Sequence, residues 1–227
     1  MKRSEINSII REMEGLIKEN GFHLPPFCNW TPEDWKNRGH EYDEIRDNML
    51  GWDITDFGLG NFDAAGFGLI TIRNGNQQTP DKYPKPYAEK LLFMRENMYA
   101  PAHFHWFKME DIINRGGGKL QIEVYNDDGN GGFADSDVTI FSDGRKYTVK
   151  AGTYITLENG ESITIVPHMY HRFHGVPGTG SVLIGEVSQC NDDNTDNRFW
   201  NPEVGRFPGI EEDEPAYRLL CNEYPKA

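Results

Sequence analysis

Two histidines separated by one residue, with a glutamate close behind, are the strongest chemical signal in the sequence. His103 and His105 lie in the segment AHFHW at residues 102–106, and Glu110 follows five residues after His105. Residues two apart on a β-strand point to the same face, so the two imidazoles lie side by side. Glu110 has the wrong parity for a straight strand and needs a bulge or turn to join them. Surface strands also carry such pairs without a ligand, so the pair indicates a metal only if further donors lie nearby.

A third imidazole is expected from a later segment, VPHMYHRFH at residues 166–174. His171 is preferred because His168 and His174 are each three positions away, an odd offset that turns them to the other face of a regular strand. Pro167 could disturb that parity, which makes His168 the alternative ligand. Three neutral imidazoles and one carboxylate suit a divalent transition metal and leave one or two coordination positions open. The predicted metal ligands are therefore His103, His105, Glu110 and His171.

Short β-prone runs carry these residues, and turn residues separate the runs. The Asp143-Gly144 and Asn159-Gly160 pairs lie between β-prone halves, and each pair tolerates positive φ, which predicts two-residue hairpins. Many strands with tight turns and no intervening helical pattern predict an antiparallel sandwich or barrel. The β-prone runs are residues 67–75, 88–97, 120–128, 137–152, 153–167 and 181–189.

The first 50 residues are predicted to form a helical extension packed on this β-domain. Apolar residues from Ile6 to Ile17 recur at three- and four-residue steps, which indicates one buried helix face, and Gly21 ends the helix. A second short helix is expected to begin at Thr31, with Pro32 in its first turn.

The division of the chain follows from these patterns. We expect a barrel over residues 51–190 and an irregular tail over 191–227 that wraps on the barrel, so that the whole chain is effectively one domain. Phe199, Trp200 and Phe207 predict that the tail is docked.

Composition excludes several classes of partner. The chain has 227 residues, 37% hydrophobic and 12% aromatic, and a formal net charge of −13, so nucleic acid and anionic membrane surfaces are poor partners. No apolar run approaches the ~20 residues of a membrane helix. Cys28, Cys190 and Cys221 are odd in number and widely spaced, as expected of free thiols in a reducing compartment, so we expect a cytoplasmic protein.

The metal-ligand pattern resembles that of a known superfamily. His103-x-His105-x4-Glu110, with Gly117 seven residues on, resembles the first cupin motif, and residues 166–173 resemble the second. The resemblance covers roughly residues 85–190 and implies a mainly β protein, a cupin-type antiparallel barrel (jelly roll) with three His and one Glu around a metal. Two positions depart from the motifs: Asn97 stands where the first expects Gly, and Met169 stands near the Gly of the second.

The whole chain is also similar to the bacterial D-lyxose isomerases. Its length, its N-terminal helix, the segment at 100–112 (APAHFHWFKMEDI) and the tail at 197–216 carry this resemblance. It implies an aldose–ketose isomerase that converts D-lyxose to D-xylulose, and also D-mannose to D-fructose. It further implies a homodimer, and a metal for which Mn²⁺ is the first expectation and Zn²⁺, Co²⁺, Fe²⁺ or Ni²⁺ are alternatives.

Such an isomerase moves a proton between C1 and C2 of an open-chain sugar through a cis-enediol, so it needs a carboxylate or amine of tuned pKa. Lys90 lies in a β-run ahead of the metal strand, Glu186 lies inside an apolar run, and Glu203 lies among tail aromatics. All three are expected to contact the substrate. The family resemblance favours Lys90 and Glu203 as the catalytic pair, whereas the residues alone leave the proton carrier open.

Other functions use the same ligand set. A cupin dioxygenase or decarboxylase would hold Fe²⁺ or Mn²⁺ for different chemistry, and a non-catalytic cupin would only bind sugar. A phosphosugar isomerase is disfavoured, because no cluster of Lys or Arg lies near the ligands in the sequence.

Overall fold

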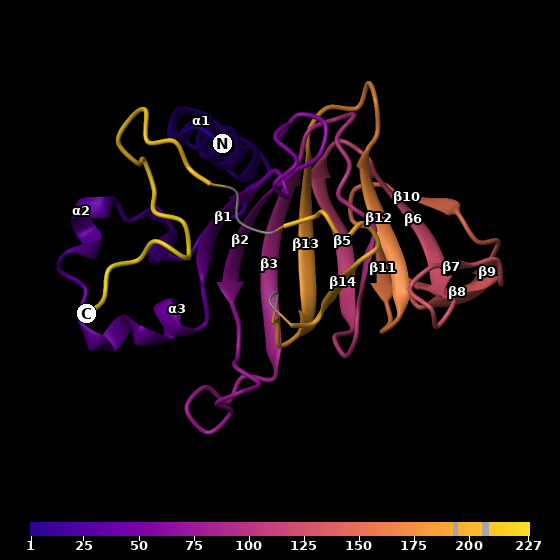
Figure 1. The fold of residues 1–227 in the computed structure, drawn as a ribbon. Helices are drawn as coiled ribbons and strands as arrows, with labels where there is room; N and C mark the ends of the chain where they lie inside the picture. The colour runs from indigo at the N-terminus through magenta and orange to yellow at the C-terminus, as the bar shows by residue number, and fades with distance from the viewer. Residues whose placement is uncertain (193–194, 206–208) are drawn as a thin grey trace.

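The computed structural model of the protein describes residues 1–192, 195–205 and 209–227. In this part of the chain two antiparallel sheets curl toward each other, and the helices gather beside one end of the larger sheet (Figure 1). The larger sheet has eight strands in the order β1-β2-β3-β13-β5-β11-β8-β9. The smaller has the order β10-β6-β12-β4-β14, with β7 added beside β6. The mainly β, antiparallel fold with an N-terminal helix is therefore confirmed.

The helices are α1 (Arg3–Glu19), α2 (Pro32–Trp35) and α3 (Asp43–Asp47), with 3-10 turns η1 (Pro26–Asn29) and η2 (His40–Tyr42). The strands are β1 (Gly51–Thr55), β2 (Phe67–Arg73), β3 (Tyr87–Met94), β4 (His103–His105), β5 (Glu110–Gly117), β6 (Leu120–Asp127), β7 (Phe133–Ala134), β8 (Val138–Ser142), β9 (Arg145–Val149), β10 (Thr153–Leu157), β11 (Ser162–Ile165), β12 (Met169–Gly175), β13 (Val182–Gln189) and β14 (Asn197–Phe199).

Helix α1 packs its apolar face on the outer part of the larger sheet. It contacts β2, where Gly68 leaves room for the Met13 side chain: a Cβ at Gly68 would lie 2.3 Å from the Met13 sulfur. Gly21 follows the helix with φ of +67°, the left-handed conformation that ends helices. Thr31 and Asp34 form a reciprocal capping box on α2, so both predicted helix signals are confirmed. The buried apolar residues of α1 are Ile6, Ile9, Ile10, Met13 and Ile17.

The two predicted hairpin turns behave differently. Asp143 and Gly144 have φ of 49° and 79° and join β8 to β9, as predicted. The hairpin at Asn159-Gly160 was a wrong prediction, because β10 pairs with β6 in the smaller sheet and β11 pairs with β5 in the larger. Both strands direct apolar side chains into the space between the sheets, so the chain crosses there from one sheet to the other.

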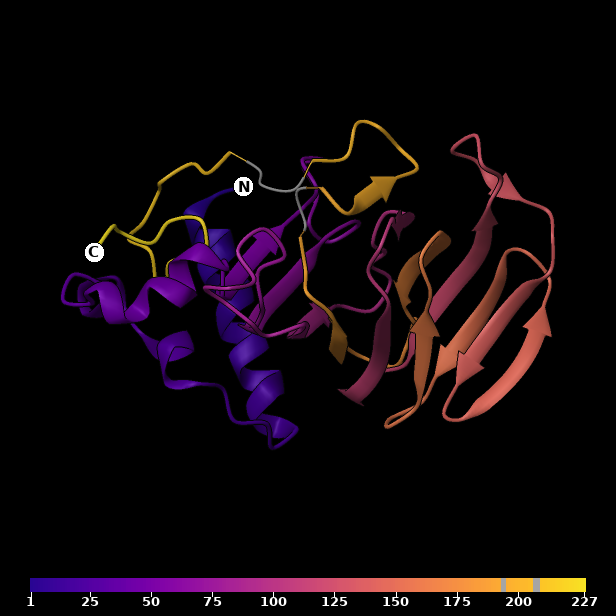
Figure 2. The same cartoon turned by 90° about the horizontal axis from the view of Figure 1, so that it is seen from below.

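The core lies between the two sheets and continues under α1. Seen from below, the strands curve around this interior, with the helices at one side and the β8–β9 hairpin at the other (Figure 2). Fully burying one such aliphatic side chain contributes about 1.5–3 kcal/mol, so the facing rows hold the sheets together. Central members are Leu92, Ile112 and Ile184 from the larger sheet and Ile122, Val124 and Phe173 from the smaller.

The C-terminal tail docks on both ends of the domain. Phe199 pairs with His103 where β14 joins β4, and Trp200 stacks on Phe133 with ring centroids 5.4 Å apart. The yellow C-terminal segment runs beside the indigo N-terminus, where Glu211 bridges to Lys2 (Figures 1 and 2). Phe207, also predicted to dock, lies outside the described residues.

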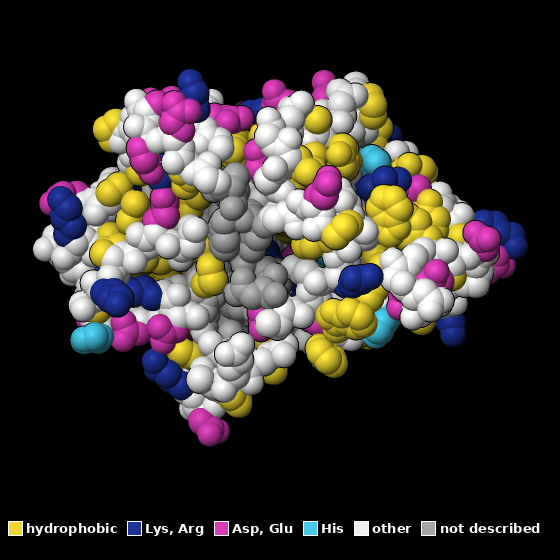
Figure 3. Space-filling view, in the orientation of Figure 1, with side chains coloured by type: hydrophobic (Ala, Val, Ile, Leu, Met, Phe, Trp, Pro, Cys, Tyr) yellow, Lys and Arg dark blue, Asp and Glu magenta, His cyan; other side chains and the backbone are white. Residues whose placement is uncertain are grey.

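No helix in the described ranges combines the length and the apolar character needed to span a membrane. On the face in Figure 3, the Lys and Arg side chains of the described residues lie scattered among acidic ones.

Candidate active site

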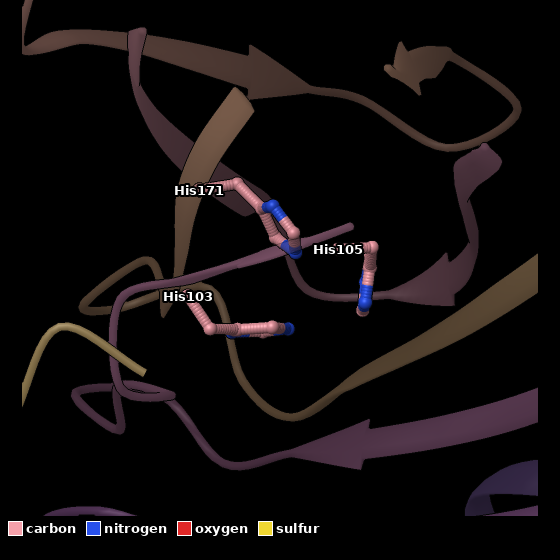
Figure 4. A group of neighbouring side chains, drawn as sticks. All are labelled: His103, His105 and His171. Carbon is pink, nitrogen blue, oxygen red and sulfur yellow. The ribbon is translucent and has the colours of Figure 1, made fainter. Parts of the chain in front are cut away.

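Three histidine side chains from two neighbouring strands meet on the inner face of the smaller sheet, the face directed toward the larger sheet. His103 and His105 come from β4, and His171 comes from β12, where it lies opposite His103 in the antiparallel register. One ring nitrogen of each lies within 4.8 Å of those of the other two, and the rings are directed toward a shared space (Figure 4). His105 and His171 are buried and His103 is partly exposed. The structure therefore brings together three of the four predicted ligands as a group that could hold one metal ion.

Backbone carbonyls fix which nitrogen of His103 and His171 is available. Nδ1 of His103 lies 2.9 Å from the Pro101 carbonyl oxygen, and Nδ1 of His171 lies 3.0 Å from that of Met169. A carbonyl only accepts, so Nδ1 donates its proton and Nε2 keeps its lone pair. Burial lowers the pKa of His171 to about 4 and that of His103 well below its usual value. Both rings are therefore neutral near pH 7, which is the metal-binding form.

Glu110 reaches the imidazoles because the chain turns between β4 and β5. It is the first residue of β5, and the turn at residues 106–109 supplies the change of parity that the sequence requires. Its Oε1 lies 3.3 Å from Nε2 of His105 and 3.4 Å from Nε2 of His171, and its Oε2 lies 2.7 Å from Nζ of Lys108. Burial would raise the pKa of Glu110, but the Lys108 ammonium and the imidazoles hold it well below its usual range. The carboxylate is ionised, with one oxygen directed at the histidines.

These donors fit a divalent metal ion. Nε2 of His105 and Nε2 of His171 are buried and have no hydrogen-bond partner among the described residues. A buried polar nitrogen without a partner costs free energy, and a bound cation would remove that cost. Neutral imidazoles with a carboxylate are a ligand set of Mn²⁺, Fe²⁺, Co²⁺, Ni²⁺ and Zn²⁺. The Glu110 oxygen that faces away from the histidines is held by Lys108, as outer partners commonly hold ligating carboxylates.

The neighbouring histidines point elsewhere. His168 has φ of +62°, is about half exposed, and packs against the Phe104 ring at 5.0 Å and the Trp106 ring at 5.4 Å. His174 lies beside Tyr154, with ring centroids 5.2 Å apart. The structure brings neither residue to the three histidines, in agreement with the preference for His171.

A wall of charged side chains from the larger sheet faces the histidines. Lys90 on β3 and Glu186 on β13 are directly opposite each other in register, and both are buried. Nζ of Lys90 lies 3.5 Å from Oε1 of Glu186, and Nζ of Lys108 lies 2.9 Å from the same oxygen. The Asn191 side-chain oxygen accepts from both lysines, at 2.7 Å from Lys90 and 3.1 Å from Lys108.

Lys108 is a site residue that the sequence reasoning missed. It is 2% exposed, whereas its neighbours Phe107 and Met109 are 75% and 44% exposed. The apolar neighbours concealed it, because a lysine between large apolar residues is normally the one that faces water. No spacing signal could have found it, because Lys108 lies in the turn at residues 106–109, where the alternation of a strand does not apply.

His103, His105 and the charged wall line one cavity of about 640 Å³, including its open mouth, and the buried His171 lies next to the two histidines. The structure does not bring Glu203 to this cavity: the residue is exposed on the tail, and its N–H donates to the Asn201 side chain at 3.0 Å. The tail instead contributes Asn197 and Phe199 to the lining. Four phenylalanines complete the apolar part of the wall: Phe57, Phe67, Phe173 and Phe199.

The chain is similar to proteins of known name and structure. Residues 1–224 match the family described as D-lyxose isomerase. The D-lyxose/D-mannose isomerase of Escherichia coli O157:H7 is 46% identical over 99% of this chain and 98% of its own length. The enzyme of the same name from Serratia proteamaculans is 45% identical over the same shares. Among solved structures, an L-ribose isomerase of Acinetobacter sp. DL28 in complex with L-ribose has a TM-score of 0.61 at 14% identity. That match covers 93% of this chain and 98% of the other.

Proposed function

Because the chain belongs to the D-lyxose isomerase family and is therefore an aldose–ketose sugar isomerase, we propose that it interconverts D-lyxose and D-xylulose, and also D-mannose and D-fructose. The observation that carries the proposal is that two of the three grouped histidines, His103 and His105, line one cavity with Glu110, Lys90, Lys108 and Glu186. Both cavity lysines already contact carboxylates, which favours an uncharged sugar over a phosphorylated one.

We propose that His103, His105, Glu110 and His171 hold a divalent metal, with Mn²⁺ as the ion used. When bound, such an ion polarises the substrate carbonyl and stabilises negative charge on its oxygen. The neutral Nε2 atoms of His103 and His171 and the ionised Glu110 are already in the forms that bind a cation.

A carboxylate must remove the proton from C2 of the aldose and return it to C1. Among the described residues the geometry favours Glu186, which is buried in the cavity and held by Lys108. As its carboxylate takes the C2 proton, the C1 carbonyl oxygen gains a proton and the sugar becomes a cis-enediol. Loss of the O2 proton and return of the carbon proton to C1 then give the ketose.

Glu203 is the second candidate for this role, and the family resemblance supports it. It would reach the substrate only if residues 200–205 moved toward the cavity that Asn197 and Phe199 already line. Lys90 stands in both versions as the group that handles protons on the substrate oxygens, because its ammonium lies at the cavity wall beside Glu186. Lys108 places a second cation next to the oxygens where negative charge develops. The phenylalanines exclude water from the enediol.

The proposal extends to the oligomeric state, the cellular location and the domain organisation of the protein. We propose a homodimer on the family resemblance, and a cytoplasmic location because Cys28, Cys190 and Cys221 are free and buried. We also propose that the helical extension at 1–50, the barrel at 51–190 and the tail at 191–227 unfold as one domain.

The test is anaerobic incubation of Mn²⁺-loaded protein with a panel of free and phosphorylated aldoses, with ketose detected by chromatography. We expect ketose from D-lyxose and D-mannose and none from the phosphosugars. Product formed without oxygen excludes the dioxygenase alternative, whereas no turnover of any free aldose would contradict the proposal.

A further inference from the structure

We propose that Asn191 is a positioning residue that holds the two cavity lysines in place for the isomerase reaction, an inference that rests on the proposed function. Its side-chain oxygen accepts hydrogen bonds from Nζ of Lys90 at 2.7 Å and from Nζ of Lys108 at 3.1 Å. One neutral oxygen therefore lies between two ammonium groups on the substrate side of the larger sheet. Asn191 follows directly after β13, the strand that carries Glu186.

Both lysines also contact carboxylates. Lys108 lies 2.7 Å from Glu110 and 2.9 Å from Glu186, so two carboxylates fix its ammonium group. Lys90 lies 3.5 Å from Glu186, and its bond to Asn191 is much the shorter contact. Like charges repel, and a shared acceptor keeps both ammonium groups directed at one point. Loss of the Asn191 oxygen is therefore expected to displace the ammonium group of Lys90, for which it is the 2.7 Å acceptor.

The backbone of Asn191 is held independently of its side chain. Its N–H donates to the Asn74 side-chain oxygen at 2.9 Å, and the Asn74 amide donates back to its carbonyl at 3.0 Å. Gln77 donates to the preceding carbonyl, that of Cys190, at 2.9 Å. Truncation of the Asn191 side chain leaves these bonds intact, so a substitution there tests the side chain alone.

A second, polar cavity of about 710 Å³ lies behind Asn191. Its amides do not form a ligand site, because they are engaged with the loop itself: Asn48 donates to the Asn74 carbonyl at 3.2 Å and accepts from Asn76 at 3.1 Å. The amide network is thus a support for Asn191, and through it for the lysines.

The experiment compares N191A, N191D and Q77A with the Mn²⁺-loaded wild type, measuring kcat, KM and metal content on D-lyxose. Displacing a reacting group by about 1 Å costs about 10²-fold, so we expect kcat of N191A to fall roughly 10- to 100-fold, with KM changed less than threefold and full metal content. N191D restores an acceptor oxygen of the same shape and should recover most of the loss. Q77A removes the bond to the Cys190 carbonyl but leaves both Asn74 bonds to the Asn191 backbone and touches neither lysine, so it should behave as wild type.

A second measurement does not depend on turnover. In protein labelled with ¹³C at the lysine ε-carbon, the Lys90 signal, assigned with K90R, should shift in N191A and stay in place in Q77A. The inference is overturned if kcat of N191A stays within threefold of wild type, if Q77A falls as far as N191A, or if N191D is no better than N191A. Inactive wild type on every free aldose would instead remove the proposed function, and this inference with it.

Discussion

The two walls of the cavity keep their functional groups in opposite states. The smaller sheet presents His103 and His171, which burial keeps neutral near pH 7 by lowering the pKa of both, to about 4 for His171. The larger sheet and the turn before it present Lys90, Lys108 and Glu186, which are charged groups in mutual contact. A metal ligand needs a free lone pair and gains from desolvation, whereas a proton-handling group needs a charge and therefore a partner of opposite sign. One cavity can therefore hold both kinds of group, because burial keeps the imidazoles neutral on one wall and ion pairs stabilise the charged groups on the other.

Glu110 is the link between the walls. It belongs to β5 of the larger sheet, yet its Oε1 faces His105 and His171 of the smaller sheet. The predicted metal site therefore forms only when the sheets are packed together, while the lysine and glutamate wall is assembled largely within one sheet.

The largest loss of activity is expected when a metal-binding imidazole is removed. His103→Ala and His171→Ala should each abolish metal uptake and lower isomerase activity by at least about 10³-fold, because the metal is expected to supply several kcal/mol of transition-state stabilisation. Elemental analysis and activity assays on the purified variants check this, with circular dichroism to confirm folding. Full metal content in either variant would remove that residue from the ligand set.

A substitution in the charged wall should separate catalysis from metal binding. Glu186→Gln should keep its metal and lose about 10²–10⁴-fold in kcat, the usual contribution of a positioned proton carrier. Glu203→Gln, measured in parallel, decides between the two carboxylates. We expect the larger loss in Glu186→Gln, because only Glu186 lies in the cavity; the reverse order would assign the proton to the tail residue.

Acid should destabilise the metal-free protein through its imidazole wall. The pKa of His171 is about 4 in the folded protein and near 6.5 when unfolded, so between these values the unfolded chain binds the extra proton. The free energy of unfolding should therefore fall by up to about 3 kcal/mol as the pH drops from 7 to 4. Urea denaturation at several pH values measures this, and His171→Gln should show a shallower slope. Equal slopes for the two proteins would contradict the assignment.

The smallest effect on activity is expected far from both walls. The Arg3 side chain donates to Glu212 at 2.6 Å and to Glu223 at 3.1 Å, and joins the N-terminus to the tail. Arg3→Ala should lower the free energy of unfolding by about 2 kcal/mol, since hydrogen bonds to charged groups contribute about 1.5–3 kcal/mol. Its kcat should stay within twofold of wild type, because none of these residues lines the cavity. A tenfold loss of kcat would connect the termini to the site.

Local sequence patterns predicted the direction of side chains correctly where strand parity or helical spacing is the physical cause of that direction. The apolar spacing in residues 6–17 identified the buried face of α1, and odd offsets separated His171 from His168 and His174. Prediction failed where the outcome depends on which strands pair. Asn159-Gly160 has the composition of a hairpin turn, yet the chain changes sheets there.

The strand-rich fold, the N-terminal helix and the histidines of the predicted metal site could be predicted from local patterns, because period, turn chemistry and ligand type act over a few residues. The inward direction of Lys108 between two carboxylates and the position of Glu203 outside the cavity came from the folded chain alone. The direction of these two side chains depends on contacts with strands and loops far away along the chain. Lys108 meets Glu186 only when β13 pairs with β5, and no spacing along the chain records that pairing.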